Sequence, residues 1–409
     1  MKRVVVKFGG TSVGNWNRVR LGAKAVYREH LRGTQVAVVV SAMGHTTDAL
    51  IKAAKASKRE VSKKELDFIM ALGERASVRV FAAALRELGA DARYIDPAQE
   101  GWPVITDSNF GLANIDFAET RRRTRKYILP LLKRRAIPVI CGFLGRDQDG
   151  NITTIGRGGS DITGFLMGKC LEADEVIIVT DVKGVMTADP NKVPGAGVLK
   201  TITVEEMRDL ARFGAQVMHP RAMSYKDPHI RARVIDFRHG NLSVGGTTIV
   251  GPSGDEFVGV RLYEKPLAML TVVGREMQTT PGILVKTSAP LSKAGINIFG
   301  VSIGPRSFSL YVAEEDMQRA LKLMHNTVTR HKLMKSVTSE GSLAMIIAES
   351  ERFIYTPGVI ARLTAPLANA RMNIIEILSS RTSISFFVNW DDRKDALKLF
   401  RQAMKEIEG

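Results

Sequence analysis

The first 260 or so residues alternate short β-branched runs with longer segments of helical period. Three of the longer segments, at 16–32, 65–89 and 161–173, place apolar residues three and four positions apart and predict helices. The short runs are continuously apolar, which is typical of parallel strands buried on both faces; they are VVVKF (4–8), VAVVV (36–40), IPVIC (137–141) and VIIVTD (176–181). This alternation predicts an α/β domain, a mainly parallel sheet sandwiched by helices, with ligands outside the carboxyl ends of its strands.

The last 143 residues have a different pattern, because they contain a repeat. Segment 267–298 aligns without gaps onto 343–374, and over the 57 positions from 267 to 323 the two copies share 20 identical residues. Each copy predicts strand, TPG turn, helix, strand, strand and helix, so duplication has produced two small α+β modules. We therefore expect three domains, at 1–262, 263–335 and 336–409.

Composition is that of an ordinary globular protein, with 44% hydrophobic and 25% charged residues. The net charge of +17 raises the question of nucleic-acid binding. However, residues 1–264 hold 40 basic and 29 acidic residues and the remainder 19 and 13, so the excess is spread along the chain. The densest run, RRRTRK (121–126), has no interleaved aromatic residues and favours a solvated helix face. Nucleic acid stays a minor alternative, and we expect no such partner.

Two cysteines without CxxC spacing and seven scattered histidines form no metal-ligand motif, so no protein-bound metal is expected. No apolar run approaches the roughly 20 residues that span a bilayer, and the start of the chain does not resemble a signal peptide. We expect a cytoplasmic protein without a membrane partner.

Two glycine-rich segments follow predicted strands and carry charge. In KFGGTS (7–12), Gly9 and Gly10 let backbone N–H groups approach an anion beside Lys7, although a plain turn with a surface lysine fits equally well. In GRGGSD (156–161), Arg157 can bind a carboxylate or phosphate through two hydrogen bonds. Asp161 alone is best explained by the helix dipole. Taken together, the two segments favour phosphate transfer.

Three further features are ambiguous on their residues alone. In VTDVKGVMTADP (179–190), Thr180 and Asp181 leave a strand and fit either a nucleotide pocket or a polar loop. SAMGHTTD (41–48) is a similar hydroxyl-rich exit. Glu74 interrupts an apolar helix; it is either paired with Arg75 or Arg79, or placed to bind an ammonium group.

These segments together resemble the aspartate kinases of the amino-acid kinase family. KFGGTSVGN, SAMGHTTD, LGERAS, GFLGRDQDGNITTIGRGGSDIT, TDVKGVMTADP and GAQVMHPRA occur in the order and at the spacing of that family, and the repeat resembles its paired C-terminal ACT domains. The resemblance covers essentially the whole chain. It implies the amino-acid kinase fold followed by two ferredoxin-like ACT domains, and transfer of the γ-phosphoryl group of ATP to the β-carboxylate of L-aspartate. The product would be 4-phospho-L-aspartate, at the entry to lysine, threonine and methionine synthesis.

The resemblance also implies roles for particular residues. Lys7 and Asp161 would be catalytic, and Glu74 and Arg157 would bind the α-ammonium and α-carboxylate groups of aspartate. The remaining substrate contacts would come from Ser41, Thr46, Thr47, Gly158, Gly159 and Ser160. ATP, with substrate-bound Mg²⁺, would contact Lys7, Gly9, Gly10, Thr180, Asp181, Met186, Asp189, Gln216 and Val217. A feedback amino acid, lysine or threonine, would bind at the ACT-like modules near Thr280, Gly282, Asn297, Thr356, Gly358 and Asn373, and these modules would join a homodimer or larger oligomer.

The chemistry agrees with this set, because a carboxylate acceptor is already anionic at neutral pH and needs no general base. The sequence departs from the family at Gln216, where lysine is common, and at Met186, where an aromatic residue is common. The TTPG and YTPG turns also lack the usual acidic residue. Two alternatives therefore stay open: a catalytically weak amino-acid sensor of the same fold, and a related kinase with another carboxylate substrate.

Overall fold

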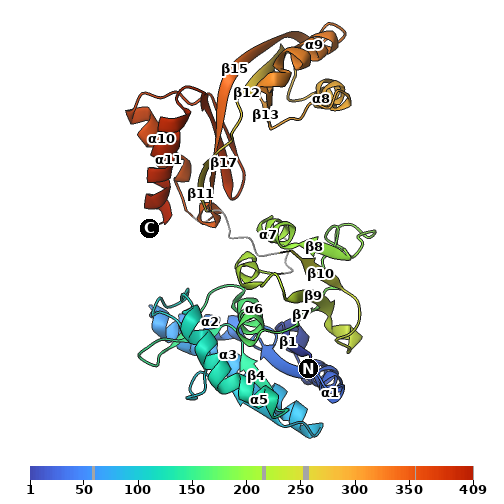
Figure 1. Ribbon diagram of the computed structural model, residues 1–409, viewed down its shortest axis with the longest axis vertical. Helices are drawn as coiled ribbons and strands as arrows, with labels where there is room; N and C mark the ends of the chain where they lie inside the picture. Colours follow the sequence, from blue (N-terminus) through green and yellow to red (C-terminus); the bar gives the residue numbers. More distant parts are fainter. Residues whose placement is uncertain (58–59, 214–217, 252–257, 355, 409) are drawn as a thin grey trace. The chain divides into compact units, whose positions relative to one another are not determined.

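The computed structural model describes residues 1–57, 60–213, 218–251, 258–354 and 356–408, which form two compact units, Met1–Glu256 and Phe257–Gly409 (Figure 1). The division falls six residues before the end of the predicted first domain, 1–262. The reason is that strand β11 (Gly259–Leu262), within that range, pairs with a strand of the second unit.

The first unit contains an eight-stranded sheet in its described residues, in the order β3-β4-β2-β1-β7-β9-β10-β8. The four predicted strands are confirmed as β1, β2, β4 and β7, and they pair in parallel. The strands are β1 (Arg3–Phe8), β2 (Gln35–Val40), β3 (Ala92–Ile95), β4 (Ile137–Cys141), β7 (Glu175–Thr180), β8 (Thr201–Thr203), β9 (Arg231–Asp236) and β10 (Thr247–Val250), with a separate hairpin of β5 (Leu144–Arg146) and β6 (Ile152–Thr154). Only the β9–β10 pair is antiparallel among the described strands of this sheet.

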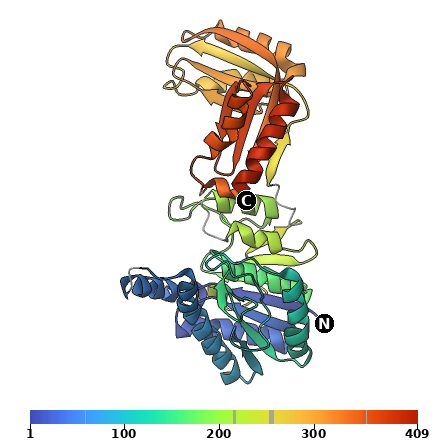
Figure 2. The same cartoon turned by 90° about the vertical axis from the view of Figure 1, so that its left-hand side faces the viewer.

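Helices cover both faces of this sheet, and the three predicted helices are confirmed as α1, α3 and α6. α1 and α3 pack together against one face, whereas α6 and α5 pack against the other (Figure 2). The helices are α1 (Trp16–Leu31), α2 (Thr46–Ser57), α3 (Lys63–Glu87), α4 (Phe117–Arg123), α5 (Leu129–Lys133), α6 (Gly159–Leu171) and α7 (Val204–Arg212), with short helical turns η1 (Thr11–Val13), η2 (Thr124–Ile128), η3 (Pro220–Tyr225) and η4 (Phe237–His239). No helix in the described ranges is both long and apolar enough to cross a membrane.

The second unit repeats one pattern of elements at the predicted offset of 76 residues. The first copy comprises β12 (Leu267–Gly274), α8 (Ile283–Lys293), β13 (Gly300–Ile303), β14 (Ser307–Ala313) and α9 (Met317–Val328), with the turn η5 (Glu314–Asp316). The second comprises the end of β15 (Met334–Glu349), η6 (Glu351–Ile354), α10 (Val359–Asn369), β16 (Glu376–Ser379), β17 (Ser383–Asn389) and α11 (Arg393–Glu408). The predicted order of elements is confirmed.

The two modules exchange strands. The first part of the long strand β15 pairs with β12 of the first module, and its last part pairs with β17 of the second. Conversely, β11, which precedes the first module, pairs with β15 in the second. The strand before each module therefore completes the sheet of the other, which ties the two modules into one unit.

A shared core lies between the two modules. Alternate residues of each sheet face that module's own helices, and the others face the opposite module. Leu267, Leu343 and Phe387 are buried in this shared core, and the rings of Tyr311 and Phe387 stack with centroids 3.9 Å apart. In Figure 1 the helices of the two modules accordingly lie on opposite sides of the strands.

The hydroxyl group of Tyr311 is a polar group in this core, and we expect it to lower the free energy of unfolding. The side chain is fully buried, and its oxygen has no hydrogen-bond partner among the described residues. Burial, with the charges of Glu376 and Glu340, raises the pKa of the phenol. A buried hydroxyl without a partner costs roughly 1–3 kcal/mol.

We therefore predict that Tyr311→Phe raises the free energy of unfolding of the second unit by about 1 kcal/mol, since it removes the hydroxyl and keeps the stacked ring. Hydrogen exchange of the slow amides in β14 and β17 measures this value. Tyr263→Phe, a change at a half-buried tyrosine of the same cluster, is the control and should be near neutral. A loss of stability in Tyr311→Phe would show that the hydroxyl has a bound partner.

Candidate active site

The loops after neighbouring parallel strands meet at one edge of the first sheet. Gly9 and Gly10 follow β1, Ser41 follows β2, Gly142 follows β4, and Asp181 follows β7. Because these strands are adjacent and parallel, residues far apart in sequence come together at their carboxyl ends.

The loop after β1 is held by backbone contacts. The amide of Gly9 and the hydroxyl of Ser12 both donate to the carbonyl of Val179, at 3.0 and 3.1 Å. A β-carbon at Gly10 would lie 3.0 Å from the carbonyl oxygen of Ala42, so the glycine permits close packing of the loops after β1 and β2.

Lys7 and Asp161 form an ion pair between β1 and the first turn of α6. The ammonium nitrogen lies 2.5 Å from Oδ1 of Asp161, and the two side chains are only 9% and 13% exposed. Asp161 is therefore more than a helix-dipole residue, because its carboxylate fixes the ammonium group beside the glycine loop.

Glu74, in α3, is buried behind the loop after β2. Its Oε1 accepts a 3.3 Å hydrogen bond from the amide of Ala42, and its Oε2 has no partner among the described residues. Arg75 and Arg79, considered as its partners, instead bind Asp96 at 3.0 and 2.7 Å. The Glu74 carboxylate is thus left for another group.

Burial raises the pKa of Glu74 to about 7, and the hydrogen bond from Ala42 offsets only part of this effect. The adjacent Gly73 packs against the next loop, since a β-carbon there would lie 2.9 Å from that of Ala42, and 3.4 and 3.6 Å from side-chain atoms of Thr47 and Thr46. The structure therefore brings both predicted threonines to the helix turn that carries Glu74. A desolvated carboxylate beside hydroxyl groups suits an ammonium-bearing ligand.

The loop that carries Arg157 has two glycines in the left-handed region, Gly156 at φ +81° and Gly158 at φ +71°. The Arg157 side chain is exposed and has no hydrogen bond or ion pair within the described part of the chain. A β-carbon at Gly142 would lie 2.7 Å from that of Ser160, so Ser160 lies at the end of β4. Gly159 packs on Phe143 and Ile155.

Asp67 supports this loop and was missed from the sequence. It lies in α3 two turns before Glu74, is fully buried, and accepts hydrogen bonds from the amide and hydroxyl of Thr154, both at 2.8 Å, and from the amide of Gly111. Desolvation raises the pKa of Asp67 despite these bonds. The helix that carries Glu74 thereby also holds the hairpin that leads to Arg157.

Of the residues predicted to bind the nucleotide, the structure joins Thr180 and Asp181 directly. Thr180 donates to Asp181 at 3.3 Å, and Arg238 donates to the Asp181 carbonyl at 2.9 Å while binding both carboxylate oxygens of Asp236. Arg238 had no sequence signal, because its role depends on the neighbouring strand β9.

Met186 is half-buried and bridges to Val198, whereas Asp189 is exposed and accepts from the amide of Asn191 in its own turn. Gln216 and Val217 lie outside the described residues.

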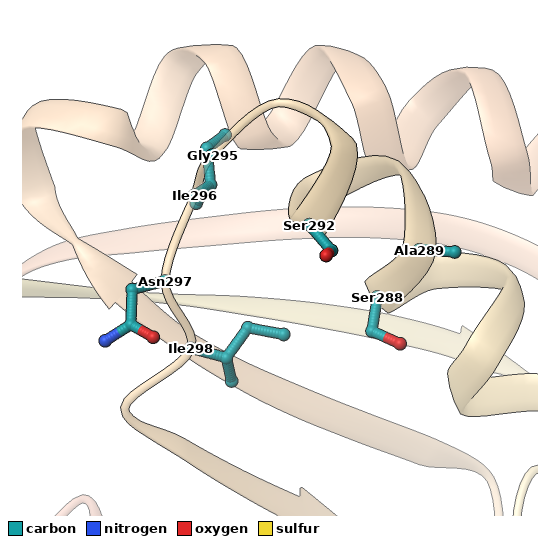
Figure 3. Close-up of a pocket in the computed structure, with 7 residues that line it drawn as sticks. All are labelled: Ser288, Ala289, Ser292, Gly295, Ile296, Asn297 and Ile298. Atoms are coloured by element: carbon teal, nitrogen blue, oxygen red, sulfur yellow. The ribbon is translucent and has the colours of Figure 1, made fainter.

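The predicted effector residues lie at matching places in the two modules. Gly282 and Gly358 are the N-caps of α8 and α10, with φ of +76° and +79°, and directly follow Thr280-Pro and Thr356-Pro. Asn297 lines an open pocket of about 610 Å³ between α8 and the segment leading to β13 (Figure 3). The other lining residues are Ser288, Ala289, Ser292, Gly295, Ile296 and Ile298. Asn373 holds the equivalent place in the second module.

Comparisons with known proteins agree with this architecture. Residues 2–236 match the model of the amino acid kinase family, and residues 262–326 and 338–402 match an ACT domain model. The chain is 31% identical to aspartokinase 2 of Bacillus subtilis, covering 99% of this chain and 98% of that protein. It is 33% identical to the aspartokinase of Geobacillus stearothermophilus, covering 94% and 93%.

Solved structures of the same fold include two aspartate kinases. That from Synechocystis is 26% identical with a TM-score of 0.80, covering 98% of this chain and 69% of that one. That of Escherichia coli aspartokinase III in complex with aspartate and ADP is 24% identical with a TM-score of 0.56, covering 98% and 99%.

Glu74 should make stability depend on pH. Its folded-state pKa of about 7 exceeds the ordinary value of 4.5, so folding favours the neutral acid. The stabilisation is complete below pH 4.5, is lost as pH rises through 7, and leaves a buried charge above that. We predict that Glu74→Gln raises the free energy of unfolding by about 3 kcal/mol at pH 8 and leaves it nearly unchanged at pH 4.5.

Urea unfolding at the two pH values measures this difference. Glu87→Gln, at the exposed end of the same helix, is the matched control and should have little effect at either pH. Equal effects of Glu74→Gln at both pH values would exclude an elevated pKa.

Proposed function

The chain belongs to the amino acid kinase family and, within it, to the aspartokinases, and we propose that the residues at the carboxyl edge of the first sheet carry out this reaction. The protein transfers the γ-phosphoryl group of ATP to the β-carboxylate of aspartate. The observation that carries our assignment of residues is the Lys7–Asp161 ion pair beside the Gly9–Gly10 loop. The buried carboxylate of Glu74 and the exposed Arg157 support it, since both are on elements that reach the same edge of the sheet.

The acceptor oxygen needs no base, because the β-carboxylate of aspartate is ionised at neutral pH. The difficulty is electrostatic: an anion must approach a polyphosphate. Lys7, with the amides of Gly9 and Gly10, would bind the transferring group, and MgATP as the substrate brings the positive charge of its own metal ion. Asp161 would hold Lys7 in place rather than accept a proton.

Aspartate would be oriented by both of its α groups. Arg157 offers its guanidinium to the α-carboxylate, and Glu74 offers its partly desolvated carboxylate to the α-ammonium. Ser41, Thr46, Thr47 and Ser160 would supply hydroxyl groups around the substrate. Two charged contacts on one end of the substrate would leave its β-carboxylate directed at the phosphoryl group, and such alignment lowers the barrier to transfer.

The adenosine part of ATP would lie over Thr180 and Asp181. Arg238 supports this proposal, because its hydrogen bond to the Asp181 carbonyl fixes the start of that loop. Met186, Asp189, Gln216 and Val217 complete the proposed contacts. ATP and aspartate are both cytoplasmic metabolites, and we place the enzyme there.

The second unit would regulate the first. ACT-type modules match both repeats, and E. coli aspartokinase III has also been solved in complex with lysine and aspartate. We propose that lysine or threonine binds the Asn297 pocket. The edge strand β13 exposes Val301 and Ile303, which favours pairing with a second copy of the chain in a homodimer or larger assembly. Light scattering on the intact protein measures that assembly.

Arg157→Lys should raise the aspartate KM by about tenfold to a hundredfold and change the ATP KM less than twofold, because lysine keeps the charge but loses the two parallel hydrogen bonds. Steady-state kinetics with each substrate varied in turn measures both values. Lys7→Ala is the companion variant and should lose nearly all turnover while binding aspartate normally.

Arg93→Lys, at an exposed arginine in β3, is the matched control and should leave both KM values unchanged. Equal effects of Arg157→Lys on the two substrates would move Arg157 to the nucleotide. Aspartate-independent release of ADP, unaffected by Lys7→Ala, would reject the proposed site.

Asn297→Ala should raise the effector concentration that halves activity by about tenfold and leave uninhibited turnover unchanged, since one polar contact to the effector is lost. Turnover is measured with lysine, threonine and methionine, singly and in pairs. Asn373→Ala tests the equivalent position of the second module. If no amino acid changes the rate, or if Asn297→Ala responds like the parent protein, the proposed effector pocket is wrong.

A further inference from the structure

The two helices of the first module form a second pocket, separate from the one that Asn297 lines. α8 and α9 pack against each other (Figure 1), and an open pocket of about 540 Å³ lies between them, near the end of α9. Pro290 of α8 and Leu323, Asn326 and Thr327 of α9 form part of its wall. The two pockets share no lining residue, although α8 contributes to both.

The rest of the wall consists of basic side chains, and none of the described lining residues is acidic; the basic ones are Lys286, Arg330 and His331. Nζ of Lys286 lies 2.8 Å from Nε2 of His331. Because an ammonium group can only donate, Nε2 accepts and the ring proton is on Nδ1. That nitrogen is shielded from solvent and has no hydrogen-bond partner among the described residues. The Arg330 side chain is exposed and makes no hydrogen bond or ion pair within the described ranges.

The helices around this pocket supply no acidic residue to balance these charges. Segments 283–293 and 317–335 contain two and five lysines and arginines, respectively, and no aspartate or glutamate. The acidic run at 314–316 precedes α9 and is therefore at the other end of that helix from Arg330. The pocket thus lies in a region of positive potential that a bound anion would neutralise.

The second module shows that the fold does not require this basic cluster. At the offset of 76 residues, Arg362 takes the place of the lysine in α8, but Glu406 and Ile407 stand where the first module has Arg330 and His331. The helix α11 continues through these positions, whereas α9 ends before them, and Ile407 is buried in the core of its module. An acidic and an apolar residue are therefore compatible with the same architecture, and the basic residues of the first module call for another explanation.

We propose that this pocket binds the phosphate group of a small molecule, either free inorganic phosphate or a phosphate ester. The Arg330 guanidinium can donate two parallel hydrogen bonds to phosphate oxygens, and Lys286 adds a second positive charge. Two positive charges match the dianion that phosphate can form, whereas a carboxylate would balance only one. Asn326 adds an amide donor, and Pro290 and Leu323 offer an apolar surface to the organic part of an ester. This site is independent of the residues assigned to the active edge.

The test is calorimetric titration of the intact protein with inorganic phosphate, phenyl phosphate and acetate at constant ionic strength. Both phosphates should bind, and acetate should bind at least about tenfold more weakly, because it carries a single charge. Tighter binding of phenyl phosphate than of inorganic phosphate would identify an ester as the ligand, and equal binding the free ion. Lys286→Met and Arg330→Gln should each weaken phosphate binding by about tenfold or more, since each removes a charge-assisted hydrogen bond from an exposed side chain.

Arg362→Met, at the position of the second module equivalent to Lys286, is the matched control and should leave the dissociation constant unchanged. Lys7→Ala should also leave binding at this site intact, which separates it from any binding of phosphate at the active edge. The inference is overturned if the parent protein binds no phosphate, if acetate binds as tightly, or if Lys7→Ala abolishes the binding. Unchanged affinity in both Lys286→Met and Arg330→Gln would equally exclude the pocket.

Discussion

The ion pair between Lys7 and Asp161 is the contact on which the arrangement of the active edge depends. It joins the carboxyl end of the central strand β1 to the first turn of α6, across 154 residues of sequence, with both charges largely removed from water. Gly164, one turn further along α6, lets the Lys7 stem pass, since a β-carbon there would lie 3.1 Å from that of Lys7. An unpaired buried charge would be costly, so pairing is what allows an ammonium group to be held at the glycine loop.

Much of this edge could be predicted from the sequence, because the information is local. Continuous apolar runs identified the central parallel strands, and glycine-rich turns with charged residues identified the loops that follow them. Asp67 and Arg238 could not be predicted, because their roles depend on hydrogen bonds to backbone groups between 44 and 87 residues away. Hydrophobic period carries no information about such partners. Glu74 was intermediate: its position in an apolar helix was visible, but only the structure shows that Arg75 and Arg79 bind Asp96 instead.

In the duplicated second unit, too, only part of the structure could be predicted from the sequence. Element order and the 76-residue offset follow from the repeat, yet the exchange of strands between modules does not, because each strand alone is compatible with either sheet. Tyr311 and Phe387 hold equivalent positions in the two copies: Tyr311 pairs with Gly300 in the first module, and Phe387 pairs with Glu376 in the second. The stacked rings of Tyr311 and Phe387 therefore lie where the two copies meet, and the tyrosine hydroxyl makes an otherwise symmetric core unequal. A small molecule or a partner chain that distinguishes the two modules must use differences of this kind.

The charged residues of the candidate site also differ in whether they have a partner of opposite charge. Lys7 is neutralised within the protein, whereas Glu74 is buried without a counter-ion and Arg157 is exposed without one in the described residues. Burial without a partner costs stability, and the elevated pKa of Glu74 is the measure of that cost. An amino acid that brings both an ammonium and a carboxylate group would satisfy both residues at once, while a simple dicarboxylate would leave Glu74 unpaired and repelled. Under the proposed assignment, selection for an amino acid over a dicarboxylic acid would follow from the lack of partners for these two side chains before the substrate binds.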